Sequence, residues 1–263
     1  MRNLTNWNQT GRRGSLLLTL FLTASISFAQ ETTNSNAIDH VGGAVTVTNN
    51  GISLLPSFSL GRPAAMFDLN VGNKKLTFEP QFRFGLDGKP WSFIFWWRYK
   101  LVQNEKFRLS VGAHPSVVFR PISLLINGVE NETFYVQRYV AAEIAPNYFI
   151  TKDISVGVYY LHSNGLDKGA IRETNFITIN SNFSNIKLSD QFYFKFNPQV
   201  FYLKMDEQDG YYATATLGLA KKDFPLSIQS ILNQAIKSNI VSKSDFVWNV
   251  SLIYSFRNDF VKK

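Results

Sequence analysis

Alternation of apolar and polar side chains, repeated in about twelve stretches, is the feature that most constrains this chain of 263 residues. The last stretch, Phe246 to Phe256, is an example. Trp248, Val250 and Leu252 share one face, whereas Asn249 and Ser251 share the other. A period of two is typical of a β-strand whose two faces meet different surroundings. The sequence therefore predicts an all-β fold.

The N-terminal residues have the pattern of an export signal. Residues 1–14 contain Arg2, Arg12 and Arg13 and no acid, and residues 15–28 are apolar or small. Small residues at the −3 and −1 positions before Gln30 complete a secretory signal peptide. The apolar run is too short for a transmembrane helix. We therefore expect a signal peptide over residues 1–29.

The rest of the chain is expected to form one domain. We expect a flexible periplasmic segment over residues 30–50, a β-barrel over 51–256 with its first strand at 52–60, and a periplasmic tail over 257–263. Short links alternate with longer ones, which favours an antiparallel up-and-down order of about twelve strands. Residues 225–238 also suit a helix by composition, but the alternation from Phe224 to Ile228 favours a strand.

The chemistry of the two strand faces favours a transmembrane barrel over a soluble one. One face is rich in aromatic residues, which in a membrane barrel meet lipid, while the polar face lines the lumen. The aromatic residues expected to face lipid are Trp91, Phe93, Phe95, Trp97, Tyr99, Trp248, Tyr254 and Phe256. The residues expected to line the lumen are Glu79, Arg83, Arg108, His114, Glu143, Lys195 and Gln199. These charges suit either a selective pore or a charge-paired network that fills the lumen.

The sequence resembles outer-membrane β-barrel proteins of Gram-negative bacteria, in particular small Bacteroidetes-type barrels. The signal ending at Ala29 and the terminal strand Phe246 to Phe256 carry this resemblance. It implies a location in the cell outer membrane, contact with outer-membrane lipids, and recognition of the C-terminal strand by the barrel assembly machinery. One departure is that residues 257–263 extend beyond Phe256, whereas the aromatic residue is often the last one.

A second, imperfect resemblance concerns catalysis. The segment from Tyr160 to Leu166 is similar to the His-x-Ser-Asn motif of outer-membrane lipid A deacylases. This resemblance implies His162, Ser163 and Glu173 as a base, a nucleophile and an orienting acid. However, His162 and Ser163 are adjacent, and adjacent residues of a regular strand point to opposite faces.

Composition excludes several other kinds of site. The chain has no cysteine and three scattered histidines, so we expect neither a metal site nor a cofactor. No Lys/Arg cluster indicates nucleic-acid binding. The favoured function is a small passive, porin-like channel or a structural membrane protein. The alternatives are a lipid-modifying hydrolase and a soluble periplasmic barrel that binds an apolar ligand.

Overall fold

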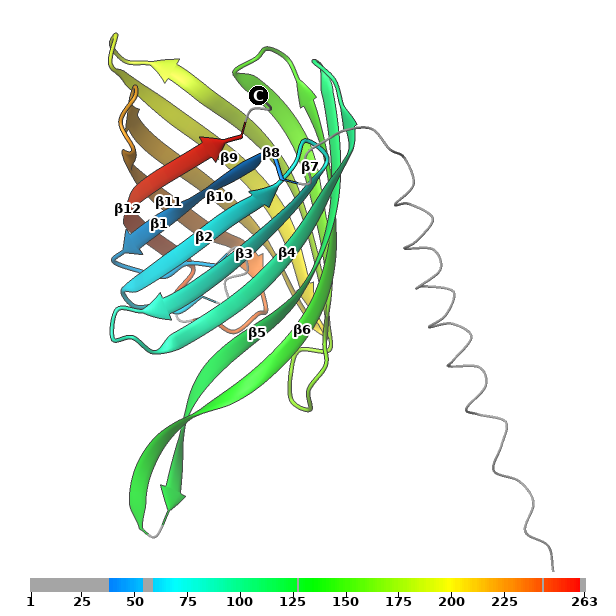
Figure 1. Cartoon of the computed structure of the whole chain (residues 1–263). Coiled ribbons are helices and arrows are strands. Elements are labelled where there is room, and N and C mark those ends of the chain that lie inside the picture. Colours follow the sequence, from blue (N-terminus) through cyan, green and yellow to red (C-terminus); the bar gives the residue numbers. More distant parts are fainter. Residues whose placement is uncertain (1–37, 54–58, 127, 243, 261–263) are drawn as a thin grey trace, which may run out of the picture. The chain divides into compact units, whose positions relative to one another are not determined.

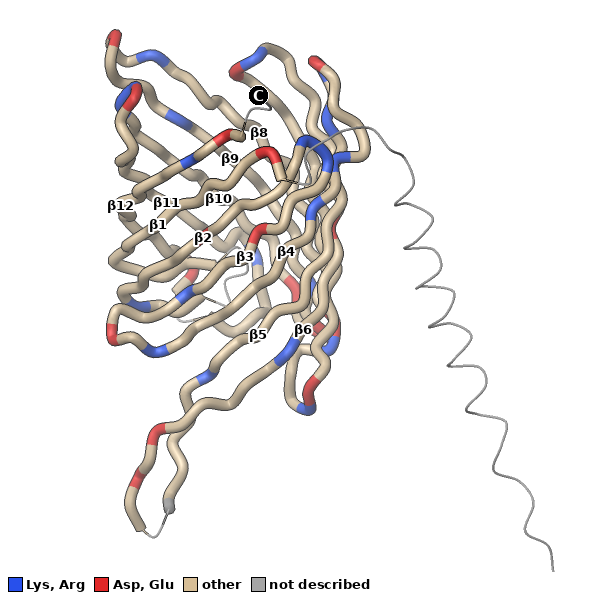
Figure 2. The backbone as a smooth tube through the Cα atoms, viewed as in Figure 1, with Lys and Arg blue, Asp and Glu red and all other residues tan. Residues whose placement is uncertain are grey.

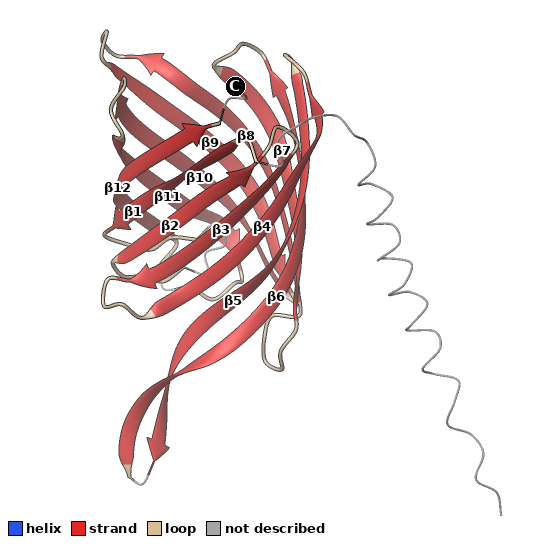
Figure 3. Ribbon diagram, viewed as in Figure 1, coloured by secondary structure: helices blue, strands red, loops and turns tan. Residues whose placement is uncertain are grey.

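Twelve antiparallel strands form a closed barrel in the computed structural model, which describes residues 38–53, 59–126, 128–242 and 244–260 (Figure 1). The strands are β1 (His40–Thr48), β2 (Ala64–Gly72), β3 (Leu76–Gly85), β4 (Pro90–Gln103), β5 (Phe107–Ile126), β6 (Val129–Phe149), β7 (Ile154–Gly165), β8 (Glu173–Lys187), β9 (Phe192–Met205), β10 (Gln208–Lys221), β11 (Leu226–Ser238) and β12 (Phe246–Asp259). Each strand pairs with its sequence neighbours, as Figure 3 shows. The predicted up-and-down barrel is confirmed, and residues 226–238 are a strand.

The pairing of β1 with β12 closes the barrel. Its register places His40 opposite Asp259 and Thr48 opposite Ser251. Both ends of the barrel chain therefore lie at one rim, which we call the terminal rim. The opposite end is called the loop rim. The predicted signal peptide, residues 1–29, lies outside the described residues.

The first strand differs from the sequence prediction. It is His40–Thr48, inside the segment expected to be flexible. Of the strand expected at 52–60, residues 52–53 and 59–60 belong to no strand, and residues 54–58 lie outside the described residues. Gly51 instead accepts a hydrogen bond from the Leu60 amide and donates one to the Arg62 carbonyl, so the β1–β2 connection turns back on itself. The barrel also extends past Phe256, because β12 continues to Asp259.

Glycine explains why β1 gives a weak strand pattern. A Cβ atom on Gly43 would lie 2.4 Å from the Asp68 carbonyl oxygen and 3.0 Å from the Phe256 ring. The close approach of β2 and the Phe256 ring therefore requires a residue without a side chain. Such a residue removes one apolar position from the alternation.

One of the longer links expected from the sequence, residues 120–132, is mostly strand. β5 and β6 continue as a two-stranded hairpin that projects beyond the loop rim (Figure 1). Their last pair is Ile126 with Val129. The two strands pair only with each other there, because β4 pairs with β5 no further than Val118.

The outer face of the barrel is apolar. Trp97, Ile179 and Val200 are 51%, 62% and 52% exposed, and Phe93 packs against Phe82 with ring centroids 5.4 Å apart. Charged residues gather mainly at the two rims (Figure 2). Soluble monomers rarely expose so large a continuous apolar surface, whereas lipid requires one. In the described residues no helix is long and apolar enough to cross a membrane. The apolar outer face of the barrel wall is the surface that meets lipid.

Candidate functional site in the barrel lumen

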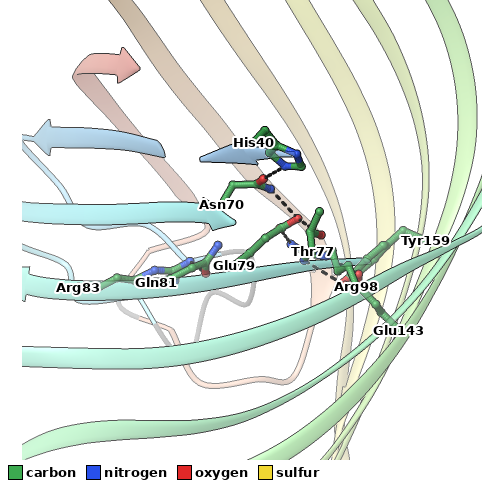
Figure 4. A network of polar contacts seen from close by, with 9 residues as sticks. All are labelled: His40, Asn70, Thr77, Glu79, Gln81, Arg83, Arg98, Glu143 and Tyr159. Carbon is green, nitrogen blue, oxygen red and sulfur yellow. Dashed lines mark hydrogen bonds and ion pairs between the residues drawn. The ribbon is translucent and has the colours of Figure 1, made fainter. Parts of the chain in front are cut away.

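A charged network lies on the inner wall across β3, β4, β6 and β7 (Figure 4). Arg98 of β4 is at its centre. Its Nε donates to Oε1 of Glu143 at 2.6 Å and its Nη2 donates to Oε2 of Glu143 at 3.2 Å. Its Nη1 donates to Oε2 of Glu79. The Tyr159 hydroxyl donates to Oε2 of Glu143 at 2.7 Å. Arg98 thus has bonds from all three nitrogens to two carboxylates.

Gly112 of β5 makes room for this network. β5 lies between β4 and β6, so a side chain at its facing position would separate Arg98 from Glu143. A Cβ atom on Gly112 would lie 2.8 Å from Oε1 of Glu143 and 3.1 Å from Cγ of Arg98. The ion pair therefore depends on a glycine in the strand that it crosses.

The network continues towards the terminal rim through Glu79. Oε1 of Glu79 accepts hydrogen bonds from Thr77 Oγ1 at 2.8 Å and from Asn70 Nδ2 at 2.9 Å. The Asn70 side-chain oxygen lies 2.5 Å from Nε2 of His40 (Figure 4). Nδ1 of His40 lies 2.6 Å from Oδ1 of Asp39. Ion pairs and hydrogen bonds therefore connect side chains from the middle of the lumen to the terminal rim.

Beside the network, the inner wall encloses a cavity of about 220 Å³. Ser53 of the β1–β2 connection and residues of five consecutive strands line it: Gln81, Arg83, Trp91, Ser92, Ile94, Trp96, Arg98, His114, Ser116, Val118, Tyr139, Ala141, Tyr159, Leu161 and Ser163. The lining combines two arginines, four serines and large rings. Such a mixture can bind a polar ligand that also has an apolar face.

Aromatic and apolar side chains occupy the lumen on the β7–β10 side. Phe201 packs between Phe176 and Tyr212, with ring centroids 4.9 and 4.8 Å away. Ile240, from the β11–β12 connection, belongs to the same buried cluster, and Ile171, from the β7–β8 connection, packs against it. This apolar cluster narrows the lumen near the loop rim.

The other residues predicted to line the lumen lie on inward-facing strand positions but outside the network. His114 is buried, its ring centroid is 4.1 Å from that of Trp96, and its Nδ1 has no hydrogen-bond partner among the described residues. The Arg108 guanidinium lies 4.3 Å from the Phe149 ring, and Lys195 Nζ lies 5.5 Å from the Tyr193 ring. Gln199 is partly buried and pairs with Thr214 of β10.

Trp91 is inside the barrel, contrary to the prediction that it faces lipid. It is only 3% exposed, lines the cavity and lies under the Arg83 guanidinium at 5.4 Å. The register of β3 with β4 explains the error. Arg83 pairs with Ser92 but Phe84 pairs with Pro90, so Trp91 is the extra residue of a β-bulge. A bulge breaks the period of two and redirects one side chain.

The other residues predicted to face lipid lie on outward-facing positions of β4 and β12. Trp97, Tyr99, Trp248, Tyr254 and Phe256 are each at least 36% exposed. Phe93 and Phe95 are partly covered by neighbouring rings, both of them contacting Phe82.

The three hydrolase candidates do not meet. Ser163 is 9% exposed and lines the inner cavity. His162 points outward, where Nδ1 lies 3.0 Å from Asn175 Oδ1 and Nε2 lies 3.1 Å from Asn164 Oδ1. Glu173 accepts a hydrogen bond from Asn175 on that outer face. His162 and Ser163 therefore open onto opposite sides of the barrel wall, as expected for adjacent strand residues.

Arg98, Trp96 and Tyr159 are central to the site but were missing from the sequence prediction. The alternation along β4 and β7 contains the information needed to place each of them. Trp96 and Arg98 alternate with outward-facing Trp97 and Tyr99, and Tyr159 stands beside outward-facing Tyr160. Strict use of the period of two would have placed all three in the lumen.

A second hollow is on the outer face and is unrelated to the network. It measures about 550 Å³ and lies over β8 to β12, where Ala213 and Ala215 are flanked by Ile179, Val200 and Leu232. Small side chains between larger ones produce this depression in the lipid-facing surface. Its described lining contains no charged residue, whereas two arginines line the lumen cavity.

Known structures share this fold at low sequence identity. The barrel is similar to the COG4313 outer membrane channel from Pseudomonas putida F1, with a TM-score of 0.50 and 11% identity over 86% of this chain and 98% of that chain. It also matches the KdgM porin, with a TM-score of 0.49 and 12% identity over 82% and 99% of the two chains. OmpT of Vibrio cholerae matches with a TM-score of 0.40 and 11% identity over 86% and 100%.

No protein-family model matches the sequence, and no curated protein matches it. At such identities the structural likeness establishes the fold alone. The closed barrel, the apolar outer face and the polar lumen together define an outer-membrane β-barrel protein.

Proposed function

We propose that the protein is a narrow passive channel for small polar solutes. The observation that carries this proposal is the polar inner wall, which holds charged side chains and a cavity of about 220 Å³ inside an apolar outer face. A barrel built only for anchorage gains nothing from polar groups removed from bulk water, because their burial is costly. A solute path through the lumen keeps such groups solvated.

The dimensions support a small conductance. Twelve strands lie between eight-stranded barrels, which side chains fill, and porins of 16 to 18 strands, which leave an open channel. The apolar cluster around Phe201 and Ile240 narrows the lumen further. We therefore expect discrete, low-conductance channels.

Planar-bilayer recording of the purified protein tests this proposal. Gly218 and Leu219 are neighbours on β10, and they face the lumen and the lipid respectively. The Gly218→Trp variant should lower the single-channel conductance, because the indole enters the lumen. Leu219→Trp should leave it unchanged. If folded wild-type protein gives no channels, the protein is a structural membrane protein and the proposal is wrong.

Export and assembly belong to the same proposal. Cleavage before Gln30 would be seen by N-terminal sequencing of protein from outer membranes. The outward aromatic residues of β12, among them Trp248, Tyr254 and Phe256, suit recognition by the barrel assembly machinery. Phe256→Ala should reduce the amount of folded barrel in cells and leave refolding of the purified chain in detergent intact. A loss of refolding would indicate a structural role of the ring instead.

A further inference from the structure

Arg83 of β3 is a charged group in the lumen without a salt bridge to any described carboxylate. We infer that the lumen cavity binds a small organic carboxylate, held by the Arg83 guanidinium beside the Trp91 and Trp96 rings. This inference rests on the proposed channel function, because the ligand must enter the lumen, and it specifies the class of solute.

The two arginines of the cavity differ in how their donors are used. The charge of Arg98 is compensated by two carboxylates, Glu79 and Glu143, and each of its nitrogens donates one hydrogen bond to them. Arg83 donates only through Nη2, at 2.9 Å to Oε1 of Gln81, which is a neutral amide. Its Nη1 and Nε have no hydrogen-bond partner among the described residues, and Nε is buried. Arg83 therefore retains both donor capacity and charge.

The carboxylate of Asp68 does not form an ion pair with Arg83. Asp68, on the neighbouring strand β2, interacts with it electrostatically but forms no salt bridge within 4.0 Å. A buried guanidinium is costly unless it is paired and hydrogen-bonded. An anionic ligand would supply the negatively charged partner that the described residues do not give to Arg83.

Neutral polar groups surround the same space. Ser92, Ser116 and Ser163 line the cavity, and none of their hydroxyls bonds to another described group. His114 adds an imidazole whose Nδ1 is also unpartnered in the described structure. Hydroxyl groups of a ligand could bond here without needing a second charge on the protein.

The rings and the volume limit the size and kind of ligand. Trp91 and Trp96 are almost completely buried and line the cavity, so they offer an apolar surface to a carbon skeleton. A volume of about 220 Å³ is below the usual range for drug-sized ligands, which starts at ~300 Å³. The planar guanidinium matches the planar carboxylate, and it repels cations. A molecule of monosaccharide size with one carboxylate meets these conditions.

Calorimetric titration of the folded full-length protein in detergent tests the inference. Glucuronate, glucose and inorganic phosphate serve as probes, because the first two differ mainly in the carboxylate. We expect glucuronate to bind at least tenfold more tightly than glucose or phosphate. Equal binding of glucose, or tighter binding of phosphate, would overturn the assignment to an organic carboxylate.

Variants then identify the site. Arg83→Gln should weaken glucuronate binding at least tenfold, while Arg108→Gln, a lumen arginine outside the cavity, should change it less than twofold. Equal losses in both variants would show a diffuse charge effect and refute the site. If Arg83→Gln does not fold, Ser116→Phe fills the cavity without touching the charge and should abolish binding.

Bilayer recording of the same protein separates the two proposals. Channels whose recorded current does not change when glucuronate is added would refute the carboxylate site. They would still support the channel function. Glucuronate binding that Arg83→Gln abolishes, in protein that forms no channels, would support the site and refute the channel.

Discussion

Arg98 of β4 and Glu143 of β6 form an ion pair over β5, the strand that separates them, with Nε and Oε1 2.6 Å apart. The Glu143 side chain is only 2% exposed, so the pair is shielded from bulk water. It ties together strands that share no backbone hydrogen bonds. The network therefore braces the barrel wall beside the apolar cluster, which Tyr159 contacts through Phe176, in addition to lining the lumen.

Gly112→Ala should destabilise the barrel, because the new methyl group would meet Glu143 and Arg98 at 2.8 and 3.1 Å. We expect a loss of about 1 to 3 kcal/mol in the free energy of unfolding, the cost of a disturbed buried hydrogen bond. Equilibrium urea unfolding in lipid vesicles measures it. Gly218→Ala is the matched control, since its Cβ would make only ordinary contact with Lys195 at 3.4 Å. Equal effects in both variants would contradict the proposed role of Gly112.

Glu143→Gln should lower the free energy of unfolding by more than the loss of an exposed ion pair does. The substitution leaves Arg98 with Glu79 alone, and breaking a buried pair typically costs about 3 to 5 kcal/mol. Glu132 pairs with Lys89 on the surface, where both side chains are exposed, so Glu132→Gln should cost less than about 1 kcal/mol. The same unfolding measurement compares the two variants. A larger effect at Glu132 would show that the lumen network is not a stabilising element.

Val200→Arg and Gln199→Arg test which face of β9 meets lipid. Val200 is on the outer face, so its replacement should destabilise the barrel by about 2 to 4 kcal/mol if it lies near the bilayer midplane. Gln199 points inward, where an arginine remains solvated, and its replacement should have a smaller effect. Folding in phosphatidylcholine vesicles provides the measurement. The reverse order would mean that the assignment of the faces is wrong.

Lys195→Glu should shift the reversal potential of the channel towards cation selectivity in a potassium chloride gradient. Lys195 is on the inner face of β9 and has no salt bridge among the described residues, so its charge acts on ions in the lumen. Lys204→Glu makes the same change on the outer face of that strand and should leave the potential nearly unchanged. A shift caused by Lys204 rather than Lys195 would place the ion path elsewhere.

Local pattern was sufficient for most strands, although it misplaced the ends of β5, β6 and β12, and it failed outright at β1 and at Trp91. The alternation in β4 and β12 identified both strands and the outward position of Trp97 and Trp248. It failed at β1, where Gly43 interrupts the apolar face, and at Trp91, where a bulge adds one residue. Both failures depend on a neighbouring strand, through the close approach of β2 at Gly43 and through the register with β3 at Trp91.

The sequence by itself determined a membrane barrel. A period of two identifies each strand within a few residues, and the contrast between its aromatic and polar faces shows that one face meets lipid and the other the lumen. Only the tertiary structure decided which charges meet. Arg98 is separated by 19 residues from Glu79 and by 45 from Glu143, and Arg83 lies on the same wall without such a partner. Register between strands and one glycine in β5 determine these contacts, and neither is visible in the periodicity of a single strand.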